Sequence, residues 1–238
     1  MSVAARRAPA ALAALICCAL LAAGCGGSSG DGDGARTGEG VATTATLAAS
    51  GRPVTDEQAL VLARVLQQNW QRGGATIAGS IPVHGATVVV EGRVDFRDGR
   101  GEMTLRDPQG QERRYAWTRE SVRAQAEPGS RSYVAQAPDP DGDPVHAAIR
   151  FINLLSAETI DNTTNIKDQD ARLLRHETLD DRAVDVYRYG ADGNTTWWVD
   201  ADDGLLAQVE AVFPDDSVLT IGLTDHGPVR IRLPRASG

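Results

Sequence analysis

The chain has 238 residues, of which 24 are basic and 32 acidic, and its formal net charge at pH 7 is −8. Nucleic-acid binding requires a basic face, and electrostatic attachment to anionic lipid requires clustered lysine or arginine. The charge therefore disfavours both kinds of partner. Lys167 is the only lysine, and we attribute this arginine bias to a GC-rich genome and not to function.

Residues 1–24 have the pattern of a secretory signal peptide. Arg6 and Arg7 precede an apolar run over residues 8–23, which ends in small side chains. A positive start, a short apolar run and small residues at the exit are the parts of such a signal. The run is shorter than the roughly 20 residues that a membrane-spanning helix needs. An uncleaved anchor and a twin-arginine signal are the weaker alternatives.

The sequence "LAAGC" at residues 21–25 resembles a bacterial lipobox. In such signals the cysteine thiol receives a diacylglyceryl group, and the peptide is then cut before the cysteine. The pattern predicts cleavage between Gly24 and Cys25 and acylation of Cys25, with fatty acids such as palmitate. Two or more acyl chains give stable anchoring, so we expect a lipoprotein held at the extracytoplasmic face of the cell membrane. A secreted protein with an incidental cysteine is the alternative.

Residues 25–54 are rich in Gly, Ser, Thr and Ala and contain almost no bulky side chain. This composition predicts a flexible tether with a root-mean-square span of about 30 Å. A single folded domain is expected over residues 55–238. The other two cysteines, Cys17 and Cys18, lie in the signal peptide, so the domain has no thiol for a disulfide, a nucleophile or a zinc site.

The domain is expected to begin with a helix at Thr55. Thr55 and Gln58 have capping-box spacing, and Gly73-Gly74 is a helix stop. Apolar residues recur at helical spacing and are predicted to be core residues: Ala59, Leu62, Leu66 and Trp70.

Alternating residues then predict an antiparallel meander with one apolar and one wet face. The residues of the apolar face are Val88, Val90, Val94 and Phe96, followed on the return strand by Met103 and Leu105. Asp98-Gly99 is a hairpin signal between the two strands. Shorter strands are expected over residues 114–118 and 121–127.

The second half is predicted to contain a loop at 137–144, a helix at 145–158 and an irregular polar stretch at 161–169. Strands are then expected at residues 171–177, 182–189, 195–213 with a turn at Asp203-Gly204, 217–223 and 228–234. Strands and helices do not alternate regularly, so the pattern indicates an α+β fold and not a parallel doubly wound sheet.

No catalytic or metal-binding pattern is found in the sequence. The histidines are predicted to lie at the surface or in turns, and none has metal-ligand spacing: His84, His146, His176 and His226. Asp139, Asp141 and Asp143 alternate, but Pro144 and Arg150 occupy the positions where a calcium loop needs glycine and glutamate. We expect no cofactor, no metal and no enzymatic activity, and an enzyme is the third alternative.

The order of these elements resembles the LppX/LprAFG family of bacterial lipid-carrier lipoproteins, which are related in fold to LolA and LolB. The stretches that carry the resemblance are "TDEQAL" at 55–60, "FINLLSAETI" at 151–160, "WWVD" at 197–200 and "DHGPV" at 225–229. The resemblance covers residues 55–234. It implies a strongly bent antiparallel sheet, a half-barrel, with helices over its concave face and acyl chains between sheet and helices.

The expected function is that of a membrane-anchored lipoprotein that binds or transfers a lipid or glycolipid. The resemblance implies that the apolar face lines the lipid cavity, through Val88, Val90, Val94, Phe96, Met103 and Leu105. The alternative is a non-enzymatic interaction or sensor module that uses the same scaffold with a filled core. The sequence specifies no protein partner.

Overall fold

The computed structural model describes residues 51–190 and 193–236. The predicted signal peptide, Gly24, Cys25 and most of the predicted tether lie outside the described residues. No helix of the described part is long and apolar enough to cross a membrane.

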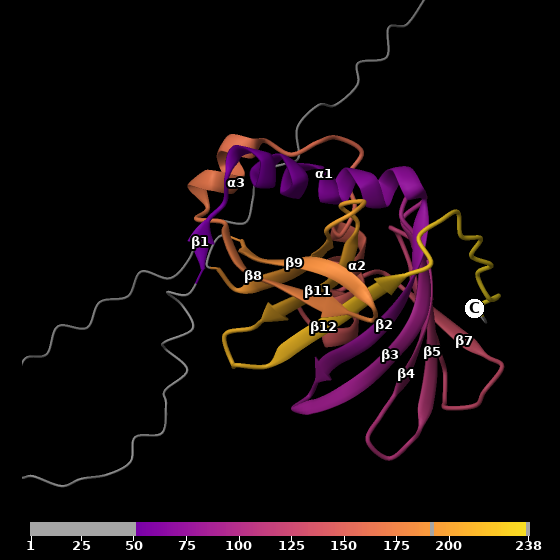
Figure 1. Cartoon of the computed structure of the whole chain (residues 1–238). Coiled ribbons are helices and arrows are strands. Elements are labelled where there is room, and N and C mark those ends of the chain that lie inside the picture. Colours follow the sequence, from indigo (N-terminus) through magenta and orange to yellow (C-terminus); the bar gives the residue numbers. More distant parts are fainter. Residues whose placement is uncertain (1–50, 191–192, 237–238) are drawn as a thin grey trace, which may run out of the picture. The chain divides into compact units, whose positions relative to one another are not determined.

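The described residues form one antiparallel sheet of twelve strands, in the order β1-β8-β9-β10-β11-β12-β2-β3-β4-β5-β6-β7 (Figure 1). The strands are β1 Arg52–Pro53, β2 Gly74–Val83, β3 Ala86–Asp95, β4 Arg100–Arg106, β5 Glu112–Trp117, β6 Val122–Gln125, β7 Tyr133–Gln136, β8 Arg172–Leu179, β9 Arg182–Tyr189, β10 Thr195–Asp200, β11 Leu206–Val212 and β12 Val218–Thr224. The sheet is strongly curved and open, with β1 and β7 at its edges. The expected α+β class with a bent antiparallel sheet is confirmed.

Three helices occur in the described part: α1 Asp56–Arg72, α2 Pro144–Leu154 and α3 Thr163–Asp168. The capping box of α1 is confirmed, because the Thr55 hydroxyl accepts from the Gln58 amide and the Gln58 side chain accepts from the Thr55 amide. Helix α2 ends at Leu154, four residues earlier than expected. Its N-cap is Asp143, whose carboxylate accepts from the amides of Val145 and His146.

Helix α3 occupies the stretch that was predicted to be irregular, so this prediction was wrong. The Asn162 side chain accepts from the Thr164 amide at 2.9 Å and caps the helix. Ile166, the one large apolar residue of the helix, is 1% exposed. Helix α3 packs beside α1 (Figure 1), and this tertiary contact, which the sequence does not encode locally, stabilises it.

The main hydrophobic core fills the concave side of the sheet between the strands and helices α1 and α2. Helix α1 contributes Ala59, Leu62 and Val65, and α2 contributes Val145, Ala148, Ile149 and Ile152. Gly101 of strand β4 is paired with Trp117 of strand β5. A Cβ at position 101 would overlap the Trp117 ring, so this glycine allows the tryptophan to lie fully buried over the strand.

The opposite face of the sheet has a smaller apolar cluster of its own, at β9 to β11. Its members are Val184, Val186, Trp198 and Ala207, with Leu174 and Leu179 packed against them. The Trp198 indole donates to Glu177, and the guanidinium of Arg175 lies 6.0 Å from the ring centroid. This half of the sheet therefore buries apolar side chains on both faces.

Two ends of the domain differ from the expectations. Residues 228–234 were predicted to form a closing strand, but they form no strand, so this prediction was wrong.

Strand β7, at one edge of the sheet, was not predicted from the sequence. The turn ahead of it is closed by a hydrogen bond from the Ser130 amide to the Glu127 carbonyl. At the other end, β1 pairs with β8 through Arg52 and Pro53, so ordered pairing begins before Thr55.

Candidate functional site

Helix α2 lies against the concave face and divides the space there. Successive helical residues are rotated by about 100°, so Val145, Ile149 and Ile152 point into the core. Pro144 lies on one flank of this buried stripe, with Ala147 farther round the helix, and Asn153 lies on the other flank. Each flank borders a pocket.

The first pocket, which we call the turn pocket, has a volume of about 800 Å³. It lies between the start of α2 and the turns that join β2 to β3 and β11 to β12. Its lining is formed by Ser80, Ile81, Pro82, His84, Gly85, Ala86, Thr87, Pro144, Ala147, Ala148, Phe213, Pro214, Asp215, Asp216, Ser217, Val218, Leu219 and Thr220.

The mouth of the turn pocket carries exposed apolar side chains. Phe213 is 37% exposed and Val218 is 40% exposed, although both are large and apolar. The turn between them is closed by a bond from the Phe213 amide to the Ser217 carbonyl at 2.9 Å. Asp215 and Ser217 bond to each other at the rim. The wall is thus apolar and the rim polar, which is the usual make-up of a small-molecule site.

The second pocket, which we call the arginine pocket, has a volume of about 510 Å³. It lies on the other flank of α2, near the end of α1 and the turns β3–β4 and β5–β6. Its lining is formed by Trp70, Phe96, Gly99, Thr118, Arg119, Pro138, Pro140, His146, Ile149, Arg150, Asn153, Leu154, Ser156, Ala157 and Glu158.

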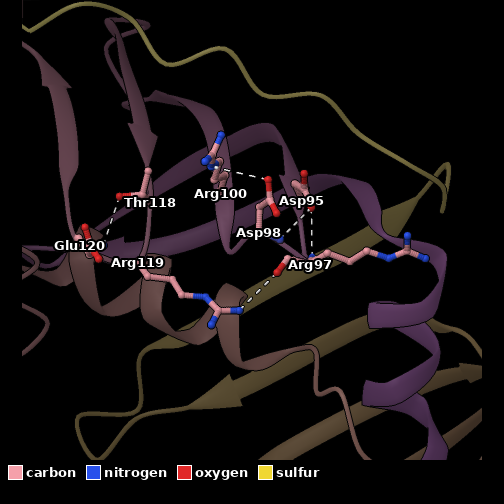
Figure 2. A network of polar contacts seen from close by, with 7 residues as sticks. All are labelled: Asp95, Arg97, Asp98, Arg100, Thr118, Arg119 and Glu120. Atoms are coloured by element: carbon pink, nitrogen blue, oxygen red, sulfur yellow. Dashed lines mark hydrogen bonds and ion pairs between the residues drawn. The ribbon is translucent and has the colours of Figure 1, made fainter. Parts of the chain in front are cut away.

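The two hairpin turns beside the arginine pocket are fixed by their own side chains (Figure 2). The Asp95 carboxylate accepts from the amides of Arg97 and Asp98, both at 3.1 Å. The Thr118 hydroxyl accepts from the amides of Glu120 and Ser121, both at 3.2 Å. These bonds hold the turn backbones, from which Arg119 reaches toward the Arg97 carbonyl and Arg97 reaches toward the end of α1.

Trp70 borders the arginine pocket, although its spacing predicted a core position. It is only half-buried, so the prediction was wrong. Arg97 lies 5.6 Å from the ring centroid and donates to the carbonyl of Trp70 at 3.2 Å and to that of Gln71. The last carbonyls of a helix lack intrahelical partners, so Arg97 satisfies them and holds the ring in place.

His146 was expected at the surface or in a turn, but it is 2% exposed and lies within α2. Its Nδ1 accepts from the Asp139 amide at 3.0 Å, and its Nε2 lies 2.9 Å from the amide nitrogen of Gln136. The ring therefore ties the loop that precedes α2 to the helix. The sequence pattern did not reveal this, because the partners come from the loop and from β7.

All six residues that were expected to face lipid are buried, with Val90 and Val94 at 0% exposure. They belong to one core cluster with the inward residues of α2. Of the six, Phe96 lines the arginine pocket, and Met103 borders a separate polar groove near the C-terminal segment. None lines the turn pocket. Contact of these six residues with lipid stays a prediction.

Aspartates of two acidic loops accept from the backbone of their own turns and form no metal site among the described residues. Asp139 accepts from the Gly142 amide at 3.1 Å, and Asp200 accepts from the Asp202 amide at 2.9 Å. Within residues 51–190 and 193–236, no group of three or more His, Cys, Asp or Glu side chains could hold a metal ion.

Burial perturbs several titratable groups, among them Tyr187, Tyr189 and His226. It raises the pKa of Tyr189 to about 12 and raises that of Tyr187, and neighbouring Asp161 and Asp185 act in the same direction on the two phenols. Burial lowers the pKa of His226. Both phenols therefore stay protonated at neutral pH, and they act as hydrogen-bond donors to Asp161 and Asp185.

No family model and no curated protein sequence matches the chain. Among solved structures, the chain is similar to the lipoprotein LppX of Mycobacterium tuberculosis, with 9% identity, coverage of 75% of this chain and 100% of that chain, and a TM-score of 0.49. It is also similar to the LolA superfamily protein NE2245 of Nitrosomonas europaea, with 9% identity, coverage of 75% and 96%, and a TM-score of 0.31. MucB of Pseudomonas aeruginosa, solved with MucA, shows 14% identity, coverage of 72% and 58%, and a TM-score of 0.35.

These likenesses concern the fold alone. LppX and a LolA superfamily protein are among the structures found, and these are the names that the order of sequence elements had suggested.

Proposed function

We propose that the chain is a membrane-anchored extracytoplasmic lipoprotein that binds or transfers a lipid, whose acyl chain enters the turn pocket. The observation that carries this proposal is a pocket of about 800 Å³ whose apolar walls continue into the exposed side chains of Phe213 and Val218. The proposed activity needs no catalytic residue and no cofactor.

The physical argument rests on where apolar surface is exposed. Each methylene removed from water contributes about 0.8 kcal/mol, so an acyl chain gains most where the wall is apolar and already formed. Small-ligand pockets usually span about 300–1,000 Å³, and the turn pocket lies within that range. An exposed phenylalanine at its mouth gives an incoming chain a first apolar contact.

Native mass spectrometry of the full chain, purified under mild conditions from its own host, tests the proposal. We expect a fraction of the protein to carry an additional mass that dissociates as a lipid. A chain that repeatedly yields only its own mass, and takes up no lipid on incubation with host lipid extract, would contradict the proposal.

Acylation of Cys25, which lies outside the described residues, is the proposed means of anchoring. We expect a Cys25→Ala chain to lose incorporation of radioactive palmitate and to leave the membrane fraction, because the thiol is the acceptor. Cys18→Ala is the matched control and should keep both the label and the membrane association. Label that persists on Cys25→Ala would show that the lipobox assignment is wrong.

A non-enzymatic interaction or sensor module is the second candidate. The observation that favours it is the packing beneath α2, where Val90, Val94 and Ile152 have no exposure at all. A core filled in this way leaves the lipid only the flanks of α2. Mass spectrometry separates the two candidates, because the module predicts no bound lipid.

A further inference from the structure

We propose that the arginine pocket is a second binding site, which takes the anionic group of an amphipathic molecule: an alkyl chain that ends in a phosphate or a carboxylate. This goes beyond the proposed function, because the site lies on the other flank of α2 from the turn pocket and adds a preference for charge.

Two guanidinium groups in the lining are available for an anion. Arg119 and Arg150 are exposed, and in the described part of the chain neither has a carboxylate oxygen within 4.0 Å. A guanidinium group presents a planar fork of donors that matches phosphate and carboxylate oxygens.

The position of Arg119 is set by the neighbouring hairpin. Gly99 has a φ of +61°, and a Cβ built there would lie 2.5 Å from Nε and 2.7 Å from Cγ of Arg119. The side chain of Arg119, from Cγ to Nε, therefore rests on the bare backbone of Gly99 at the β3–β4 turn. Its guanidinium also lies 3.5 Å from the Arg97 carbonyl (Figure 2). The side chain is thus ordered along the edge of the pocket.

Asn153 adds an oriented neutral donor. The indole of Trp117 donates to Oδ1 of Asn153 at 3.1 Å, so the amide nitrogen is left as the group that can donate elsewhere. Asn153 lines the pocket and lies one helical turn from Arg150. An oxygen of an anionic group between them would receive hydrogen bonds from both side chains.

The rest of the wall suits an alkyl chain. Trp70, Phe96 and Ile149 line the same pocket, and Leu154 is 56% exposed at its edge. A free phosphate ion would leave this apolar surface in water, whereas an amphiphile covers it. The combination of apolar wall and unpaired guanidinium groups therefore favours an amphiphile over an inorganic anion.

The charge of the groups around the pocket also favours an anionic ligand. One carboxylate, that of Glu158, is in the lining against two guanidinium groups. The carboxylates of the adjacent turn are engaged, because Asp98 lies 3.8 Å from Arg100 and Asp95 accepts from two turn amides. The pocket thus has an excess of positive charge in a chain whose net charge is −8.

Isothermal titration calorimetry of the full chain carrying Cys25→Ala tests the proposal with three probes: decyl phosphate, decanol and inorganic phosphate. Because a charged hydrogen-bonded contact contributes more than a neutral one, we expect decyl phosphate to bind about tenfold more tightly than decanol. Inorganic phosphate should bind more weakly still, which separates a headgroup from free phosphate as the source of the anion.

The variant Arg119→Gln/Arg150→Gln should lose about tenfold in affinity for decyl phosphate and leave decanol binding unchanged. Arg119→Lys/Arg150→Lys, which keeps the charge, should retain a preference for decyl phosphate over decanol. Arg131→Gln/Arg230→Gln is the control for net charge, since both residues are exposed outside the pocket, and it should bind like the parent chain. Equal melting temperatures exclude a folding defect.

Three results would overturn the proposal: equal affinity for decanol and decyl phosphate, unchanged affinity in the glutamine variant, or binding of inorganic phosphate as tight as that of decyl phosphate. The same titration in an Ala147→Trp chain keeps this proposal distinct from the proposed function. Substitution at Ala147 alters the turn pocket, so charge-dependent binding that survives it belongs to the arginine pocket.

Discussion

At the scale of single residues, bonds between aromatic donors and side-chain oxygens join the sheet to its surroundings. Trp117 reaches from β5 to Asn153 of α2, and Tyr189 reaches from β9 to Asp161. A buried indole or phenol needs a hydrogen-bond partner, and each of these bonds fixes the distance between two elements. The contact between Trp117 and α2 also sets the orientation of the amide that faces the arginine pocket.

His226 provides a pH-dependent contribution at this scale. Its Nε2 is buried and has no hydrogen-bond partner among the described residues, and burial lowers its pKa from the ordinary 6.5. Below pH 6.5 this histidine is protonated in the unfolded chain, whereas in the folded chain it stays neutral until a lower pH. The residue therefore lowers the free energy of unfolding as the pH falls.

We expect the free energy of unfolding in urea to be smaller at pH 5.5 than at pH 7.5, and His226→Gln to reduce that difference. His84→Asn is the control, because His84 is exposed in a turn with a φ of 49°, which asparagine tolerates. An unchanged pH dependence in His226→Gln would show that His226 does not titrate in this way.

At the scale of elements, the sequence predicted α1 and most strands because their information is local. The Thr55–Gln58 box and the turn at Asp98-Gly99 act over a few residues. The errors arose where tertiary contacts decide the outcome. Helix α3 forms against α1, and residues 228–234 alternate like a strand but pair with no neighbour.

Helix α2 is the element on which both pockets depend, and its start is fixed by Asp143. The carboxylate accepts from the amides of Val145 at 2.8 Å and His146 at 3.3 Å. We expect Asp143→Ala to lower the free energy of unfolding by about 0.5–2 kcal/mol, the usual cost of losing an N-cap.

Urea unfolding measures this loss, and Asp141→Ala is the control. Asp141 is exposed in the same loop, so its substitution should change the stability by no more than about 0.5 kcal/mol. Equal stability of the two variants would contradict the capping role of Asp143.

At the scale of the whole molecule, the curved sheet was predictable and the pockets were not. The alternation of Val88, Val90 and Val94 correctly indicated the buried face. Whether a buried face borders a cavity depends on how closely α2 packs on it. A local sequence pattern does not indicate how closely two elements pack. The turn pocket is formed by the turns at residues 84–85 and 213–217, the adjoining strand ends and Ala147, segments that are far apart in the sequence.

The central claim is that an acyl chain enters the turn pocket beside α2. It is tested most directly by the uptake of a neutral pyrene-labelled acyl ester, followed by fluorescence, in Ala147→Trp and in the control Ala183→Trp. Ala147 is half-buried in the pocket wall, whereas Ala183 is exposed on β9.

The account predicts that the parent chain and Ala183→Trp bind the ester equally. Ala147→Trp should lose about tenfold or more in affinity, because the indole occupies the volume of the chain, at an unchanged melting temperature. Equal binding by all three proteins, or no binding by the parent chain, would contradict the account.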